Sequence, residues 1–187
     1  MFEGNIVKNE LHDLIRQIEQ ENGITFSNTQ KVLLSIEGSI TAILDVLYGT
    51  VSIFTLNQDY INADASKSEL LNVDEGEEIH LREVLIHGKG KPMIYAKSYI
   101  PLSRYREKSR EDIMKGKLPI GRILKKYEVE SRRMINEIYI EKPSSTLREL
   151  FHTSEEFISR DYVVIENGKI IMWTKESFPI SYFSKEI

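Results

Sequence analysis

The sequence of 187 residues contains no cysteine and no long uninterrupted apolar run. Without cysteine the chain can form no disulfide, no thiolate nucleophile and no cysteine zinc site. A reducing compartment fits this composition, so we expect a cytoplasmic protein. No stretch of about 18 consecutive apolar residues occurs, so we expect no membrane span. The N-terminal segment also lacks the apolar run of a signal peptide.

Basic residues are also not in excess, because the formal net charge is −4 at pH 7. This balance argues against non-specific nucleic-acid binding, although a local basic site for a small anion remains compatible with it. Hydrophobic residues make up 41% of the chain and charged residues 29%, which is ordinary for a globular protein. The length predicts a single domain over residues 1–187.

Sequence signatures of metal and nucleophile sites are missing. The four histidines are scattered along the chain, at His12, His80, His87 and His152. No pair of them has the spacing of metal ligands, so we expect no metal site. The segment EGSIT lacks the G-x-S-x-G turn of serine hydrolases, and HGKGKP joins two strands rather than a strand and a helix.

Helical patterns occupy two parts of the chain. Apolar residues between Asn9 and Asn22 recur at helical spacing, and a second such pattern runs from Ile40 to Gly49. The heavily charged segment 103–117 predicts a solvent-exposed helix or a flap. In LPIGRILKKY, Pro119 fits the first position of a short helix.

Strand patterns account for most of the rest. Residues 50–61 are rich in β-branched and aromatic residues, and residues 79–100 form a predicted hairpin. Residues 62–77 are polar and predict a loop. Residues 132–140 alternate, with Met134, Asn136, Ile138 and Ile140 on one face and Arg133, Ile135, Glu137 and Tyr139 on the other. The segment DYVVIENGKIIMWTKE predicts a hairpin around the type I′ pair Asn-Gly. About six antiparallel strands with flanking helices predict an α+β fold.

Arg82 and Glu176 each extend an otherwise apolar strand face. Arg82 shares its face with Val84 and Ile86, but the opposite face also carries a charge. Alternation therefore leaves Arg82 either exposed, paired with a structural carboxylate, or lining a pocket where its planar fork grips a ligand carboxylate. Glu176 shares a predicted face with Ile170, Met172 and Thr174, and across the turn with Val163 and Ile165. It lies either at the solvent edge or at the mouth of a pocket.

A third feature is the start of the predicted helix in LPIGRIL. The amides of Ile120 and Gly121 would be unpaired donors there, which is either an ordinary helix start or an anion site.

Four segments, in this order, resemble the chorismate lyase (chorismate–pyruvate lyase) family. They are LLSIEGSITAILDVLYGTVSIFTL, LREVLIHGKGKPMIYAKSYIP, LPIGRIL and SRDYVVIENGKIIMWTKESFP. The resemblance covers residues 30–183 and is closest to the divergent, archaeal-type branch, with residues 1–28 as a helical N-terminal segment. It implies an antiparallel sheet whose ligand site is enclosed under helical flaps. It also implies that chorismate is converted to 4-hydroxybenzoate and pyruvate without a cofactor.

The resemblance also implies roles for four residues. Arg82 binds the ring carboxylate, and the backbone amide of Ile120 donates to the same group. Glu176 contacts the ring hydroxyl, and the amide of Ile40 donates on that side. The spacing between Glu176 and Pro179 is one residue shorter than in the enterobacterial pattern, so Lys175 competes with Glu176 for the position of the family glutamate. Only a glutamate fits the role of contacting the ring hydroxyl.

The alternative is a non-catalytic module that binds an aromatic carboxylate. The effector-binding domains of one class of bacterial transcription regulators share this fold and a similar arginine-bearing strand. Those regulators carry an N-terminal winged-helix domain of some 70 residues, whereas about 28 residues precede the shared region here. Both interpretations imply a small-molecule partner and no nucleic acid or membrane.

Overall fold

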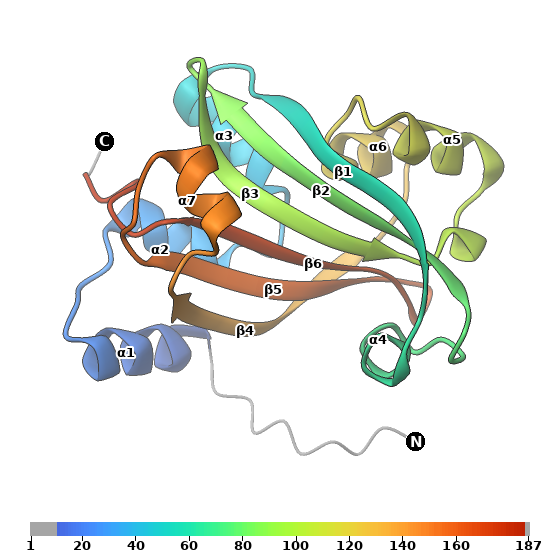
Figure 1. The fold of residues 1–187 in the computed structure, drawn as a ribbon, viewed down its shortest axis with the longest axis horizontal. Helices are drawn as coiled ribbons and strands as arrows, with labels where there is room; N and C mark the ends of the chain where they lie inside the picture. Colours follow the sequence, from blue (N-terminus) through green and yellow to red (C-terminus); the bar gives the residue numbers. More distant parts are fainter. Residues whose placement is uncertain (1–10, 186–187) are drawn as a thin grey trace.

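The computed structural model describes residues 11–185, and six antiparallel strands in one sheet dominate them (Figure 1). The order across the sheet is β1-β2-β3-β6-β5-β4, so the two hairpins meet where β3 pairs with β6. The strands are β1 (Ser52–Asn62), β2 (Glu78–Gly88), β3 (Lys91–Ile100), β4 (Arg132–Glu141), β5 (Phe157–Glu166) and β6 (Lys169–Pro179). This arrangement confirms the predicted α+β fold.

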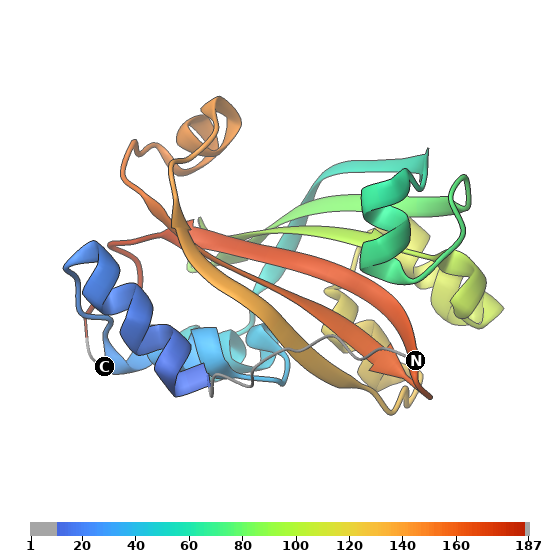
Figure 2. The ribbon, with the colours of Figure 1, turned by 90° about the horizontal axis from the view of Figure 1, so that it is seen from below.

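Helices cover the two faces of the sheet unequally (Figure 2). One face packs against α1 (Leu11–Asn22), α2 (Asn28–Ser35), α3 (Ile40–Tyr48), α5 (Glu107–Lys115) and α6 (Ile120–Lys126). Among the described residues, the other face carries only α4 (Ala65–Leu71) and α7 (Ser145–Phe151), with smaller apolar clusters beneath them. A single 3₁₀ turn, η1 (Leu102–Arg104), follows β3.

The main face holds two separate apolar cores. One core joins α1, α2 and α3 to residues such as Ile94 and Ile158, and the other joins α5 and α6 to residues such as Ile100 and Val164. Polar and charged side chains of the sheet lie between these cores, and the candidate site occupies that position.

A β-bulge in the last hairpin changes which residues share the face of Glu176. Ile165 pairs with Ile170 and Val164 pairs with Met172, so Ile171 is an extra residue on β6. One extra residue reverses the side-chain alternation of one strand relative to its partner. The prediction that Ile170, Val163 and Ile165 share the face of Glu176 is therefore wrong. The neighbours on that face are Met172, Thr174, Val164, Tyr162 and Arg160.

A second bulge has the same effect on β4. Ile135 pairs with Tyr162 and Glu137 pairs with Asp161, so Asn136 is the extra residue. The predicted alternation over residues 132–140 therefore fails at this point. Arg133 and Ile135 lie on the same face as Ile138 and Ile140, toward the helices rather than away from them.

Other differences from the predicted elements are local. The segment 62–77 contains α4, which Asp64 caps by accepting a hydrogen bond from the Lys67 amide. The apolar pattern before Gly49 is preceded by a separate helix, α2, with a capping box of Ser27 and Gln30. Pro119 is the N-cap of α6 rather than its first residue. The predicted start of the first helix at Asn9 lies outside the described residues.

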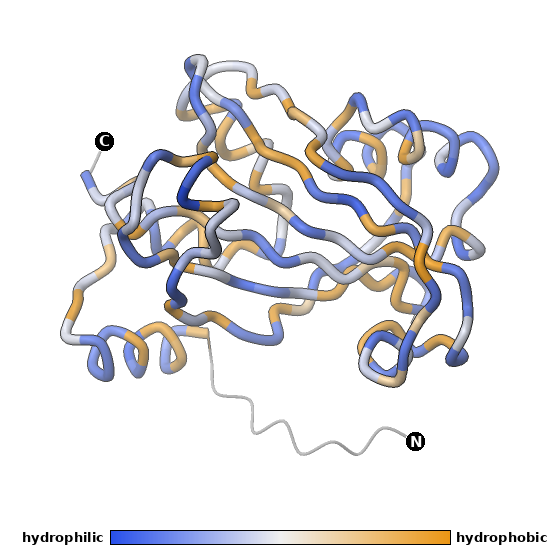
Figure 3. The backbone as a smooth tube through the Cα atoms, in the orientation of Figure 1, coloured by the Kyte–Doolittle hydropathy of each residue, from blue (hydrophilic) through white to orange (hydrophobic). Residues whose placement is uncertain are grey.

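The charged segment 103–117 is a packed helix rather than a fully solvated one. Its colouring in Figure 3 is largely hydrophilic, in agreement with its sequence. Ile113 is nevertheless completely buried, and the Gln58 and Thr55 side chains of β1 donate hydrogen bonds to the carbonyls of Met114 and Gly116. These contacts hold α5 and the following loop against the edge of the sheet.

Candidate active site

A cavity lies between the main face of the sheet and the first residues of α3 and α6. About 520 Å³ of space free of protein atoms lies in it, part of which is open to solvent. Arg82, Glu176, Ile120 and Ile40 all line it. The structure therefore brings together the four residues singled out from the sequence, while their individual roles stay predictions.

Arg82 is a buried cation without an anionic partner. Its side chain is 2% exposed, and it forms no salt bridge within the described residues. Nη2 donates to the carbonyls of Leu118 at 2.8 Å and Gly116 at 3.4 Å, and Nε has no acceptor. Burial lowers the pKa of Arg82 from 12.5 to about 10. A charge so poorly compensated by the protein favours a ligand anion.

The turns that begin α3 and α6 meet over the cavity. A Cβ atom added to Gly121 would lie 2.6 Å from Ser39 Oγ, so only glycine allows this approach without a shift. The Ser39 and Thr41 hydroxyls, 2.7 Å apart, hydrogen-bond to each other at the same turn. None of the backbone hydrogen bonds of the described chain uses the amides of Ile40 or Ile120 as donors.

Arg122 fixes α6 against α3. Its Nη2 atom lies 2.8 Å from each carboxylate oxygen of Asp45 and 3.1 Å from the carbonyl of Val51. Burial alone would raise the pKa of Asp45, but hydrogen bonds from Arg122 and the Val51 amide lower it below its usual value. The glycine and arginine of LPIGRIL thus have distinct structural roles. Gly121 permits the close approach of the turns that begin α3 and α6, and Arg122 stabilises it.

Glu176 is buried and held in one orientation by β5. Arg160, directly opposite it in the hairpin, donates from Nε to Oε2 at 2.9 Å, and the Tyr162 hydroxyl donates to Oε1 at 3.1 Å. Two lone pairs are available on each carboxylate oxygen, so Oε1 can accept one further hydrogen bond from a ligand. Lys175 pairs with Glu141 instead and does not line the cavity.

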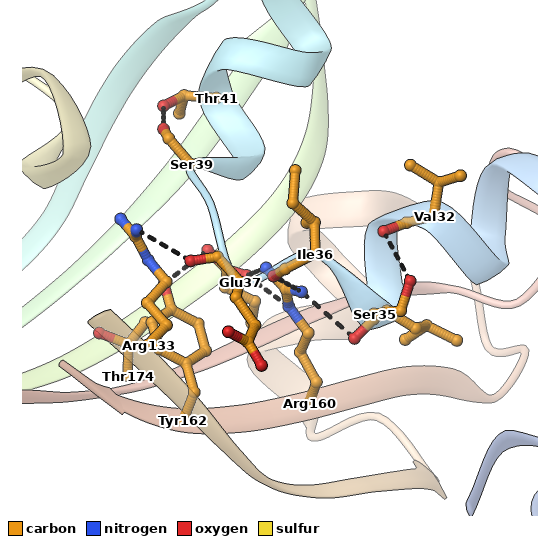
Figure 4. Close-up of polar contacts among 12 residues, drawn as sticks. Val32, Ser35, Ile36, Glu37, Ser39, Thr41, Arg133, Arg160, Tyr162 and Thr174 are labelled. Atoms are coloured by element: carbon orange, nitrogen blue, oxygen red, sulfur yellow. Dashed lines mark hydrogen bonds and ion pairs between the residues drawn. The ribbon is translucent and has the colours of Figure 1, made fainter. Parts of the chain in front are cut away.

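Arg160 was not identified from the sequence. Counting outward from the Asn-Gly turn places Ser159 opposite Glu176, and only the bulge at Ile171 moves Arg160 there. Its Nη1 atom also donates to the carbonyls of Ile36 and Leu34, which connects β5 to the loop before α3 (Figure 4). The available signal for Arg160 was an arginine within a strand that is otherwise rich in apolar residues, SRDYVV.

Arg133 was also not identified from the sequence, because a bulge changes the face of the strand on which it lies. The bulge on β4 turns it toward the cavity, which it lines together with Tyr162. Figure 4 shows its guanidinium near the carbonyl of Glu37, to which Nη1 donates at 3.3 Å.

His80 is buried on β2, two residues before Arg82, and burial lowers its pKa. No cluster of three or more metal-ligating side chains occurs within residues 11–185. In the same part of the chain, no helix is long and apolar enough to cross a membrane.

Sequence comparison gives a consistent assignment. A family model described as "Chorismate pyruvate-lyase Rv2949c-like" matches residues 34–185. The chain is also 29% identical over 160 residues to the protein named "Putative lyase MJ0807" of Methanocaldococcus jannaschii, which covers 82% of this chain and 79% of that protein.

Structural comparison shows the same fold in regulatory proteins. The effector domain of PhnF from Mycobacterium smegmatis superimposes with a TM-score of 0.63 and 13% identity, over 76% of this chain and 88% of that domain. A GntR-family transcriptional regulator from Bacillus cereus gives a TM-score of 0.59 and 12% identity, over 73% of this chain and 96% of that one. At such low identity these likenesses describe the fold alone.

Proposed function

Because the chain belongs to the Rv2949c-like chorismate pyruvate-lyase family, we propose that it converts chorismate to 4-hydroxybenzoate and pyruvate. The observation that carries the proposal is the buried Arg82, which has no carboxylate partner within residues 11–185 and lines the same cavity as Glu176. A cation and a hydrogen-bond acceptor on one cavity wall match the carboxylate and hydroxyl of the product.

Each group has a separate role in the proposed complex. The ring carboxylate binds the guanidinium of Arg82 and the backbone amide of Ile120. The ring hydroxyl donates to Oε1 of Glu176, whose other oxygen is already occupied by Arg160. The amide of Ile40 donates on the hydroxyl side. All these groups are fixed by backbone or by buried contacts, so little reorganisation accompanies binding.

The proposed reaction needs little chemical assistance. The bond between ring C3 and the ether oxygen breaks, and its electron pair leaves with enolpyruvate. C4 loses its hydrogen as a proton, so a new double bond completes the aromatic ring, and the enolpyruvate carbon is protonated to give pyruvate. The protein mainly holds the reactive conformer and excludes water. Orientation of this kind can supply up to about 7–11 kcal/mol of the barrier.

A direct assay tests the proposal. Purified protein is mixed with chorismate, and 4-hydroxybenzoate is followed by its absorbance. The expected result is product formation well above the uncatalysed rate, reduced about 100-fold in kcat by Glu176→Gln. Lys175→Gln is the matched control, since Lys175 lies next to Glu176 but pairs with Glu141 away from the cavity. A folded protein that forms no product above background would refute the proposal.

The second candidate function is binding of an aromatic carboxylate without turnover. The likeness to the effector domain of PhnF favours it, since that domain has the same fold. The two functions differ in the assay just described. A pure binding module would bind 4-hydroxybenzoate tightly but leave chorismate unchanged.

A further inference from the structure

The charges around the cavity do not balance with a single-carboxylate ligand. Three charged side chains line it, namely Arg82, Arg133 and Glu176. Glu176 is already neutralised by Arg160, which is buried behind it at 2.8 Å. Two positive charges therefore face the ligand without counter-ions from the part of the chain that the structure describes. The product 4-hydroxybenzoate carries one carboxylate, whereas chorismate carries two.

Arg133 resembles Arg82 in being incompletely partnered. It forms no salt bridge within residues 11–185, and its buried Nε atom has no acceptor. Its one hydrogen bond to the protein, from Nη1 to the Glu37 carbonyl, is long at 3.3 Å. The centre of its guanidinium lies 5.9 Å from the centre of the Tyr162 ring, which supports the side chain from the sheet side. Such a planar cation is suited to a carboxylate.

The two arginines lie at opposite sides of the site. Arg82 is on β2 and Arg133 is on β4, and β3, β6 and β5 separate them. Four strand spacings of about 4.8 Å separate their two strands by about 19 Å across the sheet, and both side chains line the same cavity. Glu176 stands on the strand between them. A ligand between these groups meets a cation, a carboxylate and a second cation in turn.

We propose that Arg133 binds the carboxylate of the enolpyruvyl side chain of chorismate. This assignment rests on the proposed function, which already places the ring carboxylate at Arg82 and the ring hydroxyl at Glu176. The enolpyruvyl ether is attached to the ring carbon next to the one that bears the hydroxyl. Its carboxylate therefore extends beyond Glu176, away from Arg82, toward the wall that Arg133 provides.

The same position gives Arg133 a part in the reaction. When the C3–O bond breaks, its electron pair moves to the enolpyruvate oxygen, and the leaving group becomes more negative. A cation at the leaving group stabilises that charge. When 4-hydroxybenzoate is bound, Arg133 has no second carboxylate to bind. Arg133 is thus a determinant of substrate binding that discriminates the dianionic substrate from the monoanionic product.

A pair of stable ligands tests the assignment without turnover. The dianion is 3-(carboxymethoxy)-4-hydroxybenzoate, and the matched monoanion is 4-hydroxy-3-methoxybenzoate, which lacks only the second carboxylate. Isothermal titration calorimetry measures both with the wild type, Arg133→Met and Arg132→Met. Arg132 is the matched control, because it is the exposed neighbour on the same strand.

We expect the wild type and Arg132→Met to bind the dianion at least about tenfold more tightly than the monoanion. Arg133→Met abolishes this preference and leaves affinity for the monoanion within about twofold of the wild type. If Arg133→Met does not fold, Arg133→Gln replaces it with the same expectation. A preference that is absent in the wild type, survives loss of Arg133, or falls equally in Arg132→Met would overturn the assignment.

The outcome is separable from that of the chorismate assay. Arg133-dependent preference without formation of 4-hydroxybenzoate would refute the proposed reaction and keep the second carboxylate site. Formation of 4-hydroxybenzoate with a preference independent of Arg133 would refute only the second site.

Discussion

Replacement of Arg82 by methionine separates affinity from stability in this protein. The substitution keeps an unbranched apolar side chain in the cavity wall and removes the guanidinium. It removes the proposed partner of the ring carboxylate together with two hydrogen bonds to the carbonyls of Gly116 and Leu118. It also removes a charge that burial disfavours.

The expected magnitudes follow from these contacts. A hydrogen bond to a charged group contributes about 1.5–3 kcal/mol, so the Kd for 4-hydroxybenzoate rises about 10- to 150-fold. For stability, the loss of two hydrogen bonds from a charged group to carbonyls costs about 3–6 kcal/mol. The pKa of Arg82 falls from 12.5 to about 10 on burial, so removing the charge returns about 3 kcal/mol. Because these effects oppose each other, the free energy of unfolding falls by at most about 3 kcal/mol.

Arg104 is the matched control. It also binds backbone carbonyls, those of Leu71, Asn72 and Ile170, but it does not line the cavity. Arg104→Met therefore lowers the free energy of unfolding and leaves ligand affinity unchanged. Titration calorimetry gives the affinities, and urea denaturation gives the stabilities.

Two results would refute the reasoning. Unchanged affinity for 4-hydroxybenzoate in Arg82→Met would remove Arg82 from the ligand site. Equal losses of affinity in Arg82→Met and Arg104→Met would show that the effect comes from loosened loops rather than from the lost charge.

Three further predictions concern the groups around the cavity. Gly121→Ala places a Cβ atom 2.6 Å from Ser39 Oγ, so we expect it to weaken 4-hydroxybenzoate binding. Adding Ser39→Ala to this variant restores part of the lost affinity. If calorimetry finds the same affinity in Gly121→Ala as in the wild type, the close approach of the two turns is contradicted. Arg160→Met leaves Glu176 as a buried carboxylate without its counter-ion, so the free energy of unfolding measured in urea falls by about 3–5 kcal/mol. A loss below about 1 kcal/mol would show that groups other than Arg160 stabilise the charge of Glu176. Burial lowers the pKa of His80 below its usual 6.5, so on acidification the unfolded chain takes up a proton that the folded chain does not, and stability falls below about pH 6.5. His80→Gln makes that fall shallower, and identical pH profiles of the two proteins would count against it.

The elements predicted correctly depend on interactions within a few residues. The alternation of apolar residues identified the strands, and the Asn-Gly pair identified the last turn, where Asn167 and Gly168 have φ values of 49° and 75°. Both positive values are what a type I′ turn requires, and only local chain geometry decides them. The six antiparallel strands and the α+β class could therefore be predicted without coordinates.

Strand register could not be predicted in the same way. The bulges at Ile171 and Asn136 are shifts in the pairing of β6 and β4 with β5, and pairing between strands is not visible in the order of residues along the chain. Since side chains alternate with a period of two, each bulge reverses every assignment beyond it. For this reason the sequence did not predict that Arg133 faces the cavity or that Arg160 pairs with Glu176.

The sequence by itself determined that Arg82 and Glu176 lie in strands of mainly apolar residues, because that is a property of neighbours along the chain. It left open whether Arg82 was exposed, paired or lining a pocket. Only the tertiary structure decided that it is buried, with no carboxylate of the described residues paired with it, against carbonyls 34 and 36 residues further along the chain. Compensation of a buried charge depends on which distant groups surround it in space, and no local pattern encodes that.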